Sequence, residues 1–172
     1  MSIIQHALEF ASEAHKFQSR KYTNEPYIIH PVSVMWIVKE VPHTDAMLCA
    51  ALLHDTVEDT EVNILDIHNE FGAEIAGLVH QLTDASRPED GNRVYRKEID
   101  RRWISGASPE AKTIKLADLL DNSASIMKHD PGFAKTYMGE KSLLLNVLRE
   151  GDSTLWVRAS RVVQDYYRGD LQ

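Results

Sequence analysis

The chain has 172 residues, a length that usually corresponds to one folded domain, and its net charge at pH 7 is −7. Hydrophobic residues make up 43% of it and charged residues 26%, which is typical of proteins with a sizeable buried core. The negative charge argues against a nucleic acid polymer as partner, because that binding relies on many Lys and Arg side chains. A small phosphate-bearing ligand is still compatible, since a metal ion and a few local cations suffice to bind it.

Three features of the sequence bear on the location of the protein. No apolar run approaches the ~18 residues that a membrane helix needs. The first ten residues, MSIIQHALEF, lack the basic segment and the apolar stretch of a signal peptide. Cys49 is the only cysteine, which excludes an internal disulfide and suits a reducing compartment. We therefore expect a cytoplasmic protein that does not act at a membrane.

Apolar residues follow a helical spacing from the N-terminus onward. The first expected helix starts after the N-cap candidate Ser2, and its apolar stripe continues to Phe17. The polar segment 20–27, RKYTNEPY, is expected to be a loop. Because proline fits the first position of a helix, Pro31 predicts a helix over about 31–41.

The pattern continues with shorter helical segments. Thr44 is expected to cap a third helix, which runs to about residue 56. Residues 63–71 and 73–82 predict two further helices separated by Gly72, a residue that commonly ends a helix.

The remaining half of the chain is also expected to be helical. Its expected elements are a loop over 84–92 and helices over about 94–104, 109–128, 131–149 and 153–168. Ser108, followed by proline and glutamate, is a well-formed helix start. No repeat, hairpin dipeptide or strand-linked phosphate loop is present. The sequence therefore predicts an all-α bundle of about eight or nine helices, a single domain over 1–172 whose C-terminal helix packs on its own core.

Candidate metal ligands occur where an apolar helix meets polar residues. In ALLHDTVEDT, His54 and Asp55 end an apolar run, and neighbouring positions on a helix point about 100° apart. Both could therefore reach one ion only near the helix end or beside a third element. His30, at the expected start of a helix, and Asp118, within KLAD, are candidates for that element.

Two imidazoles and two carboxylates form a ligand set that suits Mn²⁺, Fe²⁺, Co²⁺ or Zn²⁺. A purely structural interpretation stands beside this one, because buried histidines are often only hydrogen-bonded. Glu58 and Asp59 follow the His-Asp pair by four positions, where carboxylates could orient or deprotonate an attacking water. The alternative for these two residues is a solvated acidic turn.

Several longer motifs occur in a fixed order along the chain. They are AHKFQSRKYTNEPYIIHPVSV, AALLHDTVEDT, FGAEIAGLVHQLTD, YRKEID and SPEAKTIKLADLLDN. Together they resemble the HD-domain phosphohydrolases of the RelA/SpoT-homologue family, and most of all its stand-alone small alarmone hydrolases. The resemblance covers about residues 4–145. It implies an Mn²⁺-dependent hydrolase, although another divalent metal is compatible, that removes the 3′-pyrophosphate of ppGpp or pppGpp.

The resemblance also implies roles for individual residues. The implied metal ligands are His30, His54, Asp55 and Asp118, and the implied catalytic pair is Glu58 and Asp59. The implied substrate residues are Arg20 and Lys21 near the base, Arg96 and Lys97 near the pyrophosphate, and Tyr137 at the nucleotide. Asn122 lies four positions after Asp118, so the same helical face could offer an amide to the ribose. For each basic pair, a solvent-facing position is the alternative.

Departures from the family pattern leave the substrate open. Where long RelA/SpoT enzymes usually read ADRLHN, this chain reads ADLLDN, so Leu119 lacks a charge and Asp121 adds a carboxylate. The loop RKYTNEPY is also one residue longer than the commonest form. The leading hypothesis is a (p)ppGpp 3′-pyrophosphohydrolase. The alternatives are the same chemistry on an adenosine alarmone, a nucleoside monophosphate or NADPH, and a module that binds a nucleotide or a partner protein without turnover. The oligomeric state stays open.

Overall fold

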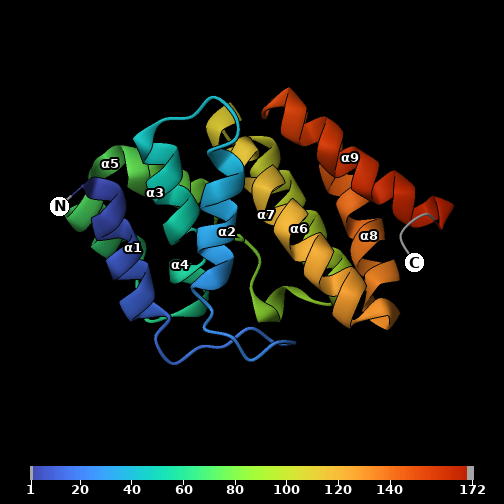
Figure 1. Ribbon diagram of the computed structural model, residues 1–172, viewed down its shortest axis with the longest axis horizontal. Helices are drawn as coiled ribbons and strands as arrows, with labels where there is room; N and C mark the ends of the chain where they lie inside the picture. The colour runs from blue at the N-terminus through green and yellow to red at the C-terminus, as the bar shows by residue number, and fades with distance from the viewer. Residues whose placement is uncertain (1, 170–172) are drawn as a thin grey trace. The chain divides into compact units, whose positions relative to one another are not determined.

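The computed structural model of the chain describes residues 2–169, and among these it contains nine α-helices and one 3-10 helix (Figure 1). It divides into two compact units, Met1–Thr83 and Asp84–Gln172. Within the described range the only extended pairing is an isolated bridge between Ser19 and Pro26. The predicted all-α fold is confirmed. Among residues 2–169, no helix combines the length and the apolar character that a membrane span requires.

The first unit is built around a central apolar helix. Its elements are α1 (Ile3–Ala14), α2 (Ile29–Val38), α3 (Asp45–Leu53), α4 (Thr56–Asp59) and α5 (Ile64–Leu82). α3 packs against α1, α2 and α5. Every residue of α3 after Asp45 is buried, because a helix that is apolar on all sides is stable only when other elements surround it. As predicted, Thr44 caps this helix: its hydroxyl oxygen accepts a hydrogen bond of 3.2 Å from the Met47 N–H.

The bounds of the first two helices differ from the prediction, and α2 also ends at Val38, three residues before its predicted end. α1 ends at Ala14, and Phe17 beyond it is 93% exposed, so the expected continuation of the apolar stripe to Phe17 is wrong. α2 begins at Ile29, two residues before the predicted start. Pro31 is still tolerated there, because the N–H groups of the first turn have no partner within the helix. His30 consequently lies inside the first turn of α2 and is buried.

The end of α3 is set by side chains that bond to its last carbonyl groups. The helix ends at Leu53, earlier than the predicted residue 56. The Thr56 hydroxyl donates a hydrogen bond of 2.7 Å to the carbonyl oxygen of Leu53, and His54 donates from Nδ1 to that of Ala51 at 2.8 Å. These bonds satisfy carbonyl groups that lack helical partners. The chain then turns, and the short α4 begins.

α5 contains the break that the sequence predicted. Gly72 has a φ of 84°, a left-handed value that glycine adopts without steric cost, and it interrupts the regular helix. Asn63 and Asp66 form a capping box at the helix start. The Asn63 side chain accepts from the Asp66 N–H at 3.2 Å, and the Asp66 carboxylate accepts from the Asn63 N–H at 2.9 Å.

The second unit consists mainly of long helices. Its elements are the 3-10 helix η1 (Pro88–Asp90), α6 (Arg93–Ser105), α7 (Pro109–His129), α8 (Pro131–Leu145) and α9 (Ser153–Arg168). α7 packs against α8 and α9, and α8 also packs against α9. Ser108 caps α7 as predicted, accepting a hydrogen bond of 3.2 Å from the Ala111 N–H. α8 ends at Leu145, four residues before the predicted end. That the two units act as a single domain stays a prediction.

Candidate functional site

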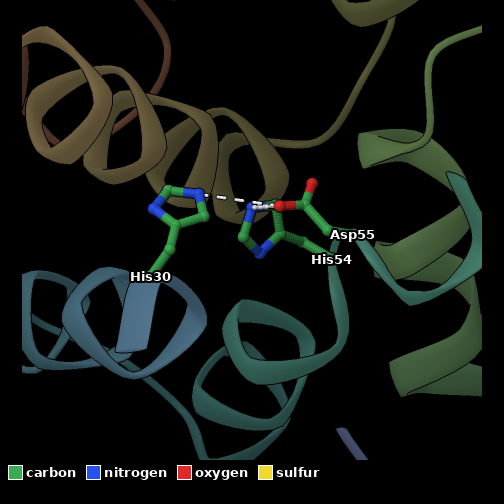
Figure 2. A group of neighbouring side chains, drawn as sticks. All are labelled: His30, His54 and Asp55. Atoms are coloured by element: carbon green, nitrogen blue, oxygen red, sulfur yellow. Dashed lines mark ion pairs between the residues drawn. The ribbon is translucent and has the colours of Figure 1, made fainter. Parts of the chain in front are cut away.

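Three of the four candidate metal ligands lie together in the first unit. Nε2 of His54 is 3.1 Å from Oδ2 of Asp55, and Nε2 of His30 is 3.6 Å from the same oxygen. Figure 2 shows His30 reaching from its helix toward the other two side chains, which follow α3. His30 is 1% exposed and His54 is 2% exposed, so both imidazoles are buried. Each residue offers one ligand atom, and these atoms all lie within 4.8 Å of one another.

The hydrogen bond of His54 determines which of its ring nitrogens can act as a ligand. A carbonyl oxygen can only accept, so Nδ1 of His54 carries the proton that it donates to Ala51. In the neutral imidazole the lone pair is then on Nε2, the nitrogen that faces Asp55. A metal-bound histidine commonly donates its other ring N–H to a backbone carbonyl, and His54 has this arrangement.

The donor atoms of this triad fit a divalent metal ion. Two ligand atoms that each lie about 2.1 Å from one ion at right angles are about 3 Å apart, close to the separations in the triad. Two imidazole nitrogens and a carboxylate oxygen also suit the metals expected from the sequence. The first unit therefore contains a group of residues that could hold a metal, although the identity of that metal is a separate question.

Asp118 belongs to the second unit, where it lies on α7 and is buried. Its Oδ1 accepts a hydrogen bond of 2.6 Å from the Asn122 amide, and its Oδ2 lies 3.1 Å from the Lys115 ammonium. The predicted one-turn spacing thus brings Asn122 onto the same face as Asp118. The role of Asp118 as a fourth ligand stays a prediction.

The expected catalytic pair lies on the short helix after the triad. Glu58 and Asp59 are both exposed on α4. Oδ2 of Asp59 accepts a hydrogen bond of 3.3 Å from the amide of Gln18, a residue 41 positions earlier in the chain. Because α3 has already ended, these carboxylates lie on a separate turn rather than one turn further along the ligand helix.

The loop that carries Arg20 and Lys21 is ordered by backbone hydrogen bonds. The Arg20 N–H donates to the carbonyl of Glu25 at 2.8 Å, and the Tyr27 N–H donates to the carbonyl of Gln18 at 3.0 Å. The guanidinium carbon of Arg20 lies 6.0 Å from the centre of the Tyr27 ring. A cation and an aromatic ring at this separation attract each other, so the loop presents Arg20 in a defined position.

The second basic pair splits into two different environments on α6. The ammonium of Lys97 lies 2.8 Å from Asp84 and 3.2 Å from Asp100, so two carboxylates already hold it. Burial lowers the pKa of Lys97, but these carboxylates outweigh burial and raise its pKa above the ordinary value. Lys97 also lines a cavity of about 590 Å³ between α6 and α8. Nε of Arg96 is buried and has no hydrogen-bond partner among residues 2–169.

Tyr137 and the two family departures also have defined positions. Tyr137 on α8 is buried, and burial raises the pKa of its hydroxyl. Leu119 is 1% exposed, so this departure from the family pattern is a core side chain of α7. Asp121 is half-buried on the same helix. The binding roles of Arg20, Lys21, Arg96, Lys97, Asn122 and Tyr137 stay predictions.

The sequence interpretation missed two side chains that contact site residues. Tyr27 donates a hydrogen bond of 2.6 Å from its hydroxyl to Oδ2 of Asp55. Gln18 contacts Asp59, as described above, and its Oε1 accepts a hydrogen bond of 2.7 Å from Nδ1 of the buried His15. The contacts of Tyr27 with Asp55 and of Gln18 with Asp59 join residues far apart in the chain, so no local spacing could have indicated them.

Comparison with known proteins assigns the chain to a family. The HD domain family matches residues 7–137. A guanosine-3′,5′-bis(diphosphate) 3′-pyrophosphohydrolase of Aquifex aeolicus is 40% identical over 122 residues, which are 69% of this chain and 17% of that protein. The protein of that name called MESH1 in Drosophila melanogaster is 39% identical over 127 residues, 72% of this chain and 69% of that protein. The chain thus spans about a sixth of the long bacterial relative and over two thirds of the short one.

The fold agrees with this assignment. A solved structure described as a metazoan orthologue of SpoT that hydrolyses ppGpp superposes with a TM-score of 0.87 at 28% identity. The match covers 96% of each chain. The chain therefore belongs to the HD domain family and is a relative of the MESH1 and SpoT hydrolases, as the sequence resemblance predicted.

Proposed function

We propose that the chain is a metal-dependent hydrolase that removes the 3′-pyrophosphate of ppGpp or pppGpp. The observation that carries this proposal is the convergence of two buried imidazoles, His30 and His54, with the carboxylate of Asp55 in a chain whose relatives are named for this reaction. In the proposed reaction, water attacks the phosphorus bonded to the 3′-oxygen, and the bond from phosphorus to that oxygen breaks. The 3′-oxygen takes up a proton, and the products are pyrophosphate with GDP from ppGpp or GTP from pppGpp.

The proposed cofactor is Mn²⁺, with Asp118 as a fourth ligand from the second unit. Mixed nitrogen and oxygen donors suit Mn²⁺, Fe²⁺, Co²⁺ or Zn²⁺, and the family resemblance favours Mn²⁺ among them. When bound, such an ion lowers the pKa of a water molecule and neutralises charge on phosphate oxygens. The hydrogen bonds from Tyr27 to Asp55 and from His54 to Ala51 hold two of the ligands in place before any metal arrives.

The remaining site residues would act on the water and on the nucleotide. Glu58 and Asp59 are carboxylates one short turn after the ligands, and we assign them the proton of the attacking water. Their exposure supports this assignment, since a carboxylate that accepts this proton must release it to solvent.

We assign the cations and the polar side chains to the substrate. Arg20 and Lys21 would contact the base, Arg96 and Lys97 the pyrophosphate, and Asn122 and Tyr137 the rest of the nucleotide. Support comes from the buried Nε of Arg96, because an unsatisfied guanidinium N–H favours an anionic ligand. We also propose that both units act as one hydrolase domain and that the enzyme is cytoplasmic.

A second candidate keeps the chemistry and changes the substrate to an adenosine alarmone, a nucleoside monophosphate or NADPH. Asp121 favours this candidate, because an added carboxylate is unfavourable near a polyphosphate unless it faces away or meets a cation. The longer loop over 20–27 would also alter the pocket for the base.

The test is product release by Mn²⁺-loaded protein from ppGpp, GTP, GDP and NADPH in parallel. His54→Ala and Asp118→Ala remove proposed ligands, and His68→Ala is the matched control because His68 is exposed on α5. Release of GDP and pyrophosphate from ppGpp alone, lost in the first two variants and kept in the third, is the expected result. Metal-dependent release from GTP, GDP or NADPH but not from ppGpp would identify a different substrate for the same chemistry. No release from any of the four would overturn the proposed ppGpp reaction and favour an untested nucleotide or a module that binds without turnover.

A further inference from the structure

The second unit contains a cluster of charged side chains drawn from three helices and the segment before them. Lys97 on α6 is held by Asp84 and Asp100, at 2.8 and 3.2 Å. Lys115 on α7 lies 3.1 Å from Asp118. In this cluster, each of these two lysines therefore has a carboxylate as its counter-charge.

Lys141 on α8 differs from both of them. Its side chain is half-buried, and within the described chain it forms no ion pair and no hydrogen bond with a carboxylate. Its ammonium instead lies 4.7 Å from the centre of the Tyr137 ring, one turn earlier on the same helix. A ring attracts a cation but carries no net charge, so the positive charge of Lys141 lacks a direct counter-charge.

The electrostatic surroundings of Lys141 show the same deficit of negative charge. Burial and the positive charge of Lys115 lower the pKa of Lys141 to about 8, with Lys97 adding to the effect. The negative charges of Asp118 and Asp84 act in the opposite direction but do not restore the ordinary value of 10.5. An anion beside Lys141 would therefore be stabilised by the ammonium. The anion would in turn stabilise the protonated form of Lys141.

We propose that Lys141 binds a phosphate group of the substrate beside Tyr137. α8 packs against α7, the helix that carries Asp118 and Asn122, so Lys141 belongs to the same helix pair as three residues already assigned to the site (Figure 1). A phosphate oxygen accepts charge-assisted hydrogen bonds from an ammonium, which supplies the missing partner. The identification of this phosphate as part of a nucleotide rests on the proposed function, whereas the presence of an anion site does not.

A structural role is the alternative for Lys141, because its methylene groups could pack on the Tyr137 ring without any contribution from the charge. Lys141→Met keeps most of this packing and removes the charge. Lys141→Arg keeps the charge, and Lys135→Met removes an exposed lysine from the same helix as a matched control. These variants separate the loss of a charge at this position from the loss of any lysine on α8.

The experiment measures the Kd of inorganic pyrophosphate by calorimetry for the full chain without added metal, with folding checked by circular dichroism. We expect Lys141→Met to weaken binding by ~10-fold or more, and Lys141→Arg and Lys135→Met to change it less than about threefold. Lysine-selective NMR should also show the pKa of Lys141 rising when pyrophosphate is added to the unmodified protein. This second measurement decides the matter if Lys141→Met does not fold.

An unchanged Kd in folded Lys141→Met, or a Lys141 pKa that does not move with pyrophosphate, overturns the proposal. These outcomes are independent of ppGpp turnover. If ppGpp is hydrolysed but the Kd of pyrophosphate is the same in Lys141→Met, the proposed function stands and the phosphate contact does not. If pyrophosphate binds through Lys141 and ppGpp is not hydrolysed, the anion site stands and the substrate assignment fails.

Discussion

The hydroxyl of Tyr27 donates a hydrogen bond of 2.6 Å to Oδ2 of Asp55. The same oxygen faces Nε2 of both His30 and His54. A carboxylate has two lone pairs on each oxygen, so this oxygen can accept from a hydroxyl and still offer electrons to a metal. Tyr27 is therefore a positioning residue for a candidate ligand.

Removal of this hydroxyl should weaken metal binding without unfolding the protein. Tyr27→Phe keeps the ring that lies beside His15 and Arg20 but leaves Asp55 without this donor. We expect a loss of about 10–100-fold in Mn²⁺ affinity, the usual effect of losing a partner that orients a ligand. Calorimetric titration with Mn²⁺ measures this affinity. Tyr95→Phe is the control, because Tyr95 is an exposed residue of α6. Equal affinities in the two variants would remove Tyr27 from the site.

Metal binding should stabilise the folded chain. At 100 times its Kd, a ligand that binds only the folded state raises the free energy of unfolding by about 2.7 kcal/mol. For a protein of this size, that corresponds to a rise in Tm of roughly 5–10 °C. We expect scanning calorimetry to show this rise with Mn²⁺ and its reversal by a chelator. His54→Ala should abolish the rise and His68→Ala should keep it; a rise that persists in His54→Ala would contradict the triad as the binding site.

The ion pair between Asp84 and Lys97 should make stability depend on pH at the acidic end. Burial raises the pKa of Asp84, but the charges of Lys115 and Lys97 lower it further, to below its ordinary value of 3.8. Because the folded-state pKa is the lower one, the carboxylate stabilises the fold above that ordinary value. This contribution is lost as the pH falls through the folded-state pKa.

Asp84→Asn should therefore lower the free energy of unfolding near neutral pH and make it less sensitive to acid below about pH 4. Urea unfolding at a series of pH values measures both effects. Glu89→Gln removes one charge from the exposed η1 and is the control for net charge. The prediction fails if the two variants show the same dependence on pH.

Gly151 lies too close to α7 for a side chain. A Cβ atom there would lie 2.9 Å from Cδ1 of Leu116 and 3.0 Å from backbone atoms of Lys112 and Thr113. Backbone atoms of a packed helix cannot move cheaply, so we expect Gly151→Ala to destabilise the fold by about 1–3 kcal/mol in urea unfolding. Gly77→Ala is the matched control, since nothing lies within 4 Å of its added Cβ. In the interior of α5 it should be stabilising by about 0.5–1 kcal/mol.

Much of the architecture could be predicted because helices depend on local signals. The caps at Thr44 and Ser108 and the break at Gly72 occur where the sequence predicted them. The missed end of α3 depends on local hydrogen bonds from side chains just past the helix to its backbone. α3 ends early because His54 and Thr56 bond to its last carbonyl groups, which hydrophobic spacing does not encode.

The sequence by itself determined the all-α class, the family resemblance and the types of residue that could bind a metal, because each of these is a property of spacing and residue chemistry along the chain. Only the tertiary structure decided that His30 and His54 face one oxygen of Asp55. It also decided that the Tyr27 hydroxyl donates a hydrogen bond to that same oxygen. The physical reason is that contacts between residues far apart in the chain depend on how the helices pack, and the helical period does not specify that packing.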